Sequence, residues 1–94
     1  MASVRNLKKN IDFLVSEVIS DSQLFMLFNP KQNTDAAYSI IEDVVEMFNN
    51  MYQRANHPDG KDNPKLVKQH YKNLRADLLS QTNSLFERIS KLKD

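Results

Sequence analysis

The sequence predicts an all-α fold, an up-down-up three-helix bundle of long antiparallel helices that forms one domain over residues 1–94. Apolar residues recur with the 3.6-residue period of a helix in three separate segments. The 94 residues include only one Gly and three Pro, which leaves few positions for turns. Because few turns imply few and long elements, the composition favours long helices over short strands.

The first helix is predicted over about residues 3–29. Asn29-Pro30 ends it, because the residue before a proline is pushed out of the helical region. Ser20, Asp21 and Ser22 favour helix caps over helix interiors, so a kink near 20–22, with a separate short helix over 22–29, stays open as an alternative. The apolar residues that fall on one side of this helix are Val4, Leu7, Ile11, Leu14, Val15, Val18 and Phe25.

The second helix is predicted to begin at Asn33 or Thr34, since either side chain can cap a helix by accepting a backbone N–H bond. After this helix, residues 57–60 (HPDG) have the pattern of a type I turn, with Pro in the second position and Gly in the fourth. The apolar side of the helix is a continuous arc of Ala37, Ile40, Ile41, Val44, Val45, Met47, Phe48, Met51, Tyr52 and Ala55.

The third helix is predicted to begin at Asn63-Pro64, with Asn as the cap and Pro in the first helical position. With reversals near residues 31 and 59, all three helices are about 23–29 residues long, or roughly 35–43 Å at 1.5 Å per residue. Matched lengths and short connections are typical of an up-down-up bundle. The side that faces the other helices is predicted to contain Val67, Tyr71, Leu74, Leu78, Leu85, Ile89 and Leu92, with Gln81 as its polar member.

Residues that could carry catalysis or hold a metal are few. The chain has no Cys, and its two histidines, His57 and His70, lack the i,i+4 spacing of a metal-binding helix. Glu42, Asp43 and Glu46 are interpreted as a solvated face, because no Glu-x-x-His pair accompanies them. A single Gly excludes the common phosphate-binding loops. We therefore expect no catalytic residue, no metal and no cofactor.

The sequence also lacks the pattern of a membrane span or a signal peptide. Its longest apolar run, residues 24–28, is far shorter than the roughly 20 residues that cross a bilayer. Charges interrupt the N-terminal stretch MASVRNLKKNIDF, unlike the apolar region of a signal peptide. Because a chain without Cys also fits a reducing compartment, we expect a cytoplasmic protein.

Six apolar residues fall outside the buried sides of the first and third helices. One interpretation is that these sides are simply wide, because each helix of a three-helix bundle packs against two others. The other is an interface between two copies of the chain, since large exposed apolar patches mark association. The residues of this predicted homodimer interface are Phe13, Leu24, Leu27, Phe28, Leu79 and Phe86.

A basic face on the third helix suggests a different function. Lys65, Lys68, Lys72 and Arg75 recur at helical spacing and could contact the phosphates of a nucleic acid. Against this, the net charge of the chain is only +1. In the expected register, Lys72 and Arg75 lie level with Glu46 and Asp43 of the second helix, so internal ion pairs could neutralise them.

Two stretches, NIDFLVSEVISDSQLFMLFNP and DLLSQTNSLFERISKL, resemble small uncharacterised all-helical proteins of the Bacteroidetes. The resemblance implies a compact helical fold, and no activity or functional residue comes with it. From the residues themselves we expect a non-enzymatic helical interaction module that self-associates. The alternative is a nucleic-acid-associated protein that uses the basic face of the third helix.

Overall fold

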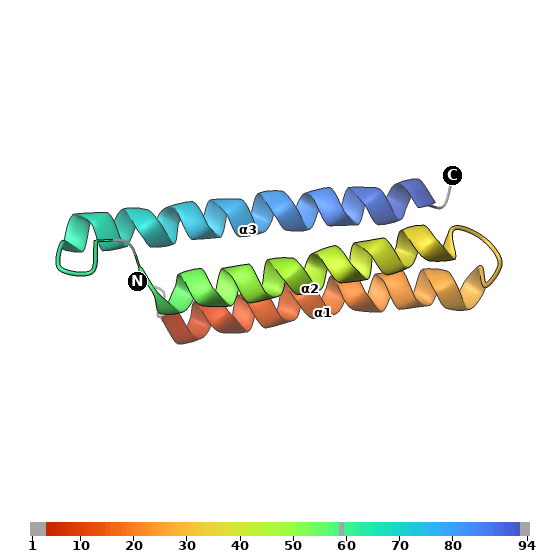
Figure 1. Cartoon of the computed structure of the whole chain (residues 1–94), viewed down its shortest axis with the longest axis horizontal. Helices are drawn as coiled ribbons and strands as arrows, with labels where there is room; N and C mark the ends of the chain where they lie inside the picture. Colours follow the sequence, from red (N-terminus) through yellow and green to blue (C-terminus); the bar gives the residue numbers. More distant parts are fainter. Residues whose placement is uncertain (1–3, 59, 93–94) are drawn as a thin grey trace.

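The computed structural model describes residues 4–58 and 60–92, which form three helices. These are α1 (Val4–Phe28), α2 (Thr34–Asn56) and α3 (Pro64–Leu92), and no strand occurs in the described ranges. Each helix contacts the other two, and successive helices run in opposite directions along a rod of 52 × 18 × 18 Å (Figure 1). The predicted all-α, up-down-up three-helix bundle is confirmed.

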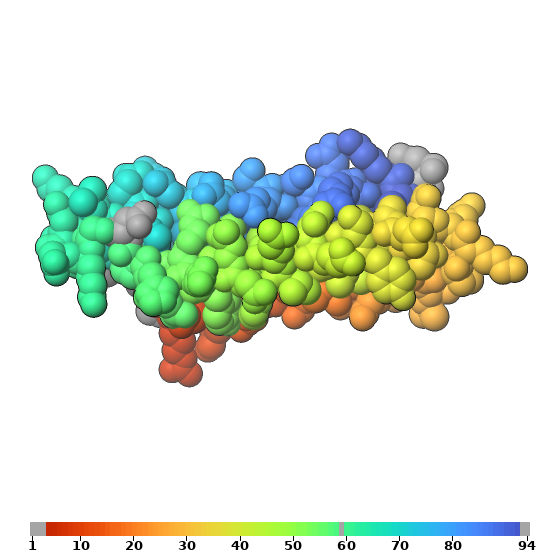
Figure 2. Space-filling model, in the orientation of Figure 1, coloured from red at the N-terminus to blue at the C-terminus, as the bar shows by residue number. Residues whose placement is uncertain are grey.

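One continuous core runs along the axis of the rod. Each helix contributes one buried row, and the side chains of Ile11, Val44 and Leu74 are completely buried. In the space-filling view, α2 covers much of α1 and lies directly against α3 (Figure 2). The core consists of Leu7, Ile11, Val15, Val18, Ile40, Val44, Met47, Met51, Ala55, Leu74, Leu78, Leu85 and Ile89.

The first helix runs without interruption through residues 20–22, so the alternative of a separate helix from residue 22 is wrong. Ser22 is completely buried, and its Oγ donates a hydrogen bond to the carbonyl oxygen of Val18, 2.8 Å away. The hydroxyl is therefore satisfied within the helix, one turn back. A small, satisfied side chain at this position lets α1 continue against the core.

The cap of α3 matches the prediction, and the cap of α2 does not. Asn63 Oδ1 accepts hydrogen bonds from the backbone N–H groups of Lys65, at 3.0 Å, and Leu66, at 3.4 Å, and Pro64 is the first helical residue. Asn33 instead has a left-handed backbone (φ 51°) and makes no side-chain cap. Its Nδ2 donates to the carbonyl oxygen of Leu92, at 3.3 Å, which ties the first connection to the end of α3.

After α2 the chain continues outward along the rod before it reverses direction, so α3 begins well beyond the end of α2 (Figure 1). The predicted turn over residues 57–60 includes Asp59, which lies outside the described residues. Gly60 has a φ of 67°, and its carbonyl oxygen accepts a 2.7 Å hydrogen bond from the backbone N–H of Asn63. The first turns of α3 therefore overhang the bundle, and Lys65 and Leu66 are exposed.

Because of this overhang, the register between α2 and α3 differs from the one expected from the sequence. Asp43, expected level with Arg75, pairs with Arg88 at 2.7 Å. Nearer the connection, Arg54 pairs with Asp77 at 2.9 Å. The prediction of an Asp43–Arg75 pair is therefore wrong, because it placed the reversal at residue 59 with no outward excursion of the chain.

The polar residues within the buried row of α3 are His70 and Thr82, whereas the predicted Gln81 is exposed. Thr82 Oγ1 is buried and has no hydrogen-bond partner among the described residues. Burial of an unsatisfied hydroxyl opposes folding, because the group loses its hydrogen bonds to water.

Replacement of Thr82 with valine is therefore expected to stabilise the protein by about 1 kcal/mol, since Val has nearly the same shape and no polar group to desolvate. Urea unfolding followed by circular dichroism measures the change. Ser22→Ala is the matched control, and it should bring no gain because the Ser22 hydroxyl is already satisfied. A less stable Thr82→Val variant would contradict this account.

Candidate functional site

Five of the six predicted interface residues have exposed side chains. Phe13, Leu24, Leu27, Phe28 and Leu79 are between 50% and 76% exposed. Leu24, Leu27 and Phe28 lie in the last two turns of α1, and Phe13 lies near its middle. Exposed apolar side chains of this size are the usual mark of an association surface when they adjoin one another.

Two of these residues converge although they lie on different helices. Phe13 of α1 and Leu79 of α3 line the same open groove, which has a volume of about 210 Å³. We define the α1–α3 face as the side of the rod that contains this groove. Its lining residues are Leu7, Asn10, Phe13, Leu14, Arg75, Leu78 and Leu79.

The sixth residue, Phe86, has a different environment from the other five. It is half-buried and packs against the core. The interpretation of a wide buried side therefore describes Phe86 well. Leu79, one residue beyond the buried Leu78, stays on the surface.

The predicted basic residues lie on the same side of α3 as Leu79. Lys65, Lys68 and Lys72 are exposed, and Arg75 is half-buried at the groove. Residues 68, 72, 75 and 79 follow one another at intervals of three or four, which places them along one side of the helix. The basic face and the apolar groove are therefore parts of one surface.

Sequence reasoning missed two acidic residues that continue this surface along α1. Glu17 and Asp21 follow Phe13 at intervals of four residues, which keeps them on the same side of the helix. Glu17 is exposed and Asp21 is half-buried. The spacing from Phe13 was the signal that could have identified them.

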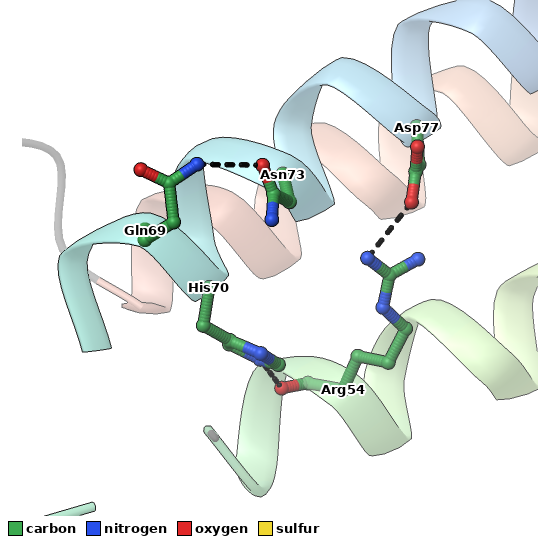
Figure 3. Close-up of polar contacts among 5 residues, drawn as sticks. All are labelled: Arg54, Gln69, His70, Asn73 and Asp77. Atoms are coloured by element: carbon green, nitrogen blue, oxygen red, sulfur yellow. Dashed lines mark hydrogen bonds and ion pairs between the residues drawn. The ribbon is translucent and has the colours of Figure 1, made fainter. Parts of the chain in front are cut away.

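A second, polar pocket of about 290 Å³ lies between the end of α2 and the start of α3. His70 Nε2 is 2.6 Å from the carbonyl oxygen of Arg54, whose guanidinium pairs with Asp77, and Gln69 donates to Asn73 at 2.9 Å (Figure 3). The contacts of His70 and Asp77 with Arg54 hold α3 onto the end of α2, while the Gln69–Asn73 bond lies within α3. The pocket is lined by Gln53, Arg54, His57, His70 and Asn73.

A third polar contact joins α1 to α2. The Tyr52 hydroxyl donates a 2.7 Å hydrogen bond to the Asp12 carboxylate, and the Lys8 ammonium lies 5.7 Å from the centre of the Tyr52 ring. This hydrogen bond, together with slight burial and the negative charge of Asp12, raises the pKa of the Tyr52 hydroxyl above its ordinary value. The contact joins α1 to α2.

The part of the chain that the structure describes contains neither a cluster of candidate metal ligands nor a membrane span. No group of three or more His, Cys, Asp or Glu side chains gathers within these residues, and no helix is long and apolar enough to cross a membrane.

The chain matches no known family model, no curated protein and no solved structure. The resemblance to small Bacteroidetes proteins therefore stays a prediction.

Proposed function

We propose that this protein is a non-enzymatic helical interaction module that self-associates through its α1–α3 face. The observation that carries the proposal is the convergence of Phe13 and Leu79, 63% and 58% exposed, on one open groove. A second copy that brings the same face would cover both residues, as the two-fold interfaces of most homodimers do.

Burial of Phe13 and Leu79 alone does not provide enough free energy for a stable dimer. Burial of a Phe or Leu side chain contributes about 1.5–3 kcal/mol, so both residues from both copies contribute about 6–12 kcal/mol at most. Association itself costs about 4–15 kcal/mol. Phe13 and Leu79 therefore support at best a weak dimer, and a stable one must also cover Leu24 and Phe28.

Analytical ultracentrifugation between about 5 and 500 µM tests this function, because that range covers weak to moderate dimers. We expect the wild-type chain to dimerise, and the double variant Phe13→Ser/Leu79→Ser to remain monomeric. The matched control is Tyr38→Ser/Val45→Ser, since both residues are exposed apolar side chains of α2, away from the groove. A wild-type chain that is monomeric at the highest concentration would contradict the proposal.

One observation favours a second function, binding of nucleic acid. Lys65, Lys68 and Lys72 are exposed along α3, where they could contact phosphates. Binding of random DNA or RNA that weakens steeply with salt, and that Lys68→Gln/Lys72→Gln reduces, would support this alternative. We also propose a cytoplasmic location, which the absence of Cys supports.

A further inference from the structure

Charge is distributed unevenly along the α1–α3 face. Before the level of Phe13 and Leu79, α3 presents Lys68 and Lys72, and beyond that level α1 presents Glu17 and Asp21. None of these four charged residues has an ion-pair partner among the described residues. One half of the face is therefore basic, the other half is acidic, and the apolar groove lies between them.

We propose that the partner on this face is a second copy of the chain in antiparallel orientation, related by a two-fold axis level with Phe13 and Leu79. This inference rests on the proposed self-association and adds its geometry. An antiparallel copy reverses the order of the charges, so the basic half of each chain meets the acidic half of the other.

The spacing of the charges fits this symmetry. Lys72 precedes Leu79 by seven residues, or about 10 Å along the helix, and Asp21 follows Phe13 by eight residues, or about 12 Å. After the two-fold rotation, Lys72 of one chain lies nearly level with Asp21 of the other. Neighbouring helix axes are about 8–10 Å apart, and the flexible lysine side chain can reach across part of that distance.

The same symmetry brings the first turns of α3 level with the apolar end of α1 in the other copy. Leu24 lies 11 residues after Phe13, and Lys68 lies 11 residues before Leu79. Phe28 and Lys65 form a similar pair, 15 and 14 residues from the axis. The overhanging first turns of α3 thus come to the same level as Leu24 and Phe28 of the other copy, diagonally across the interface, where the methylene groups of long lysine side chains can pack on apolar surface while the ammonium stays in water.

A parallel arrangement of the two chains neither pairs opposite charges nor brings the first turns of α3 level with the apolar end of α1. It would bring the lysines of both copies to the same end of the face, and like charges brought together at an interface cost up to several kcal/mol. The charges therefore select the antiparallel orientation, while the apolar residues supply the area.

Charge reversal provides the test. Lys68→Glu/Lys72→Glu places acidic side chains in both halves of the face, with Lys65 and Arg75 left in place, and Glu17→Lys/Asp21→Lys places basic side chains in both halves. In ultracentrifugation, each variant alone is expected to dimerise at least about tenfold more weakly than the wild type, which corresponds to about 1.4 kcal/mol. An equimolar mixture should form a heterodimer, and the variant that carries all four substitutions should recover the homodimer.

The outcomes separate this geometry from the proposed function. Circular dichroism first establishes that each variant is folded. Dimer formation in the equimolar mixture shows independently that both charge variants are folded. If the wild type dimerises and both charge variants dimerise equally well alone, the antiparallel geometry is wrong and self-association stands. If the wild type is monomeric, both proposals fail.

Discussion

Replacement of Leu74 with alanine is expected to lower the free energy of unfolding by about 2–5 kcal/mol. Leu74 is completely buried in the core, so the loss includes both its transfer out of water and the cavity that remains. Since a domain of this kind has about 5–15 kcal/mol of stability, this single change can remove much of it.

Urea unfolding of the variant by circular dichroism measures the effect. Leu66→Ala is the matched control, because Leu66 has the same side chain on the same helix and is 52% exposed. A surface change of this kind should alter stability by no more than about 0.5 kcal/mol. Equal effects at the two positions would show that the core does not lie where the structure places it.

Replacement of Gly60 with alanine is expected to destabilise the protein by about 1–3 kcal/mol, a range typical of backbone strain. The φ of 67° at Gly60 lies in the left-handed region, which disfavours residues with a Cβ. In addition, a Cβ at this position would lie 2.4 Å from the Cβ of Leu66, which the first turn of α3 holds in place. Both effects act on the connection that sets the start of α3.

Gly60→Asn separates the two effects. Asn tolerates the left-handed region better than Ala does but carries the same Cβ, so it should retain only the penalty for the contact with Leu66. Thermal unfolding of the two variants side by side measures the difference. If alanine at position 60 leaves stability unchanged, the connection does not need this conformation.

Periodicity predicted the three helices well because burial of one side of each helix dominates the local pattern. The first helix, expected over about residues 3–29, is observed as Val4–Phe28. Local cap chemistry likewise identified Asn63 and Pro64. For the same reason, the sequence singled out Phe13 and Leu79, which lie outside the buried rows and are exposed.

The register of α3 could not be predicted in this way, since it depends on the path of the second connection. In this connection the chain runs outward before Asn63 and turns at Gly60, which has a left-handed backbone. Neither feature appears in the spacing of apolar residues. The side chain of Asn33 was also wrongly predicted to cap α2, because its actual partner, the Leu92 carbonyl, is distant in sequence. The convergence of charges and apolar residues on one face depends on how α1 and α3 lie side by side, which only the assembled bundle shows.

Because the rod has an odd number of helices, the chain starts near one end of it and finishes at the other: α1 begins near one end and α3 ends at the other (Figure 1). In the proposed pair this direction cancels, because the two-fold axis makes both ends of the assembly identical. Such an interface is saturated by one partner, so assembly stops at two chains and does not continue into a filament. A head-to-tail contact between the same rods would keep the direction and could propagate without limit.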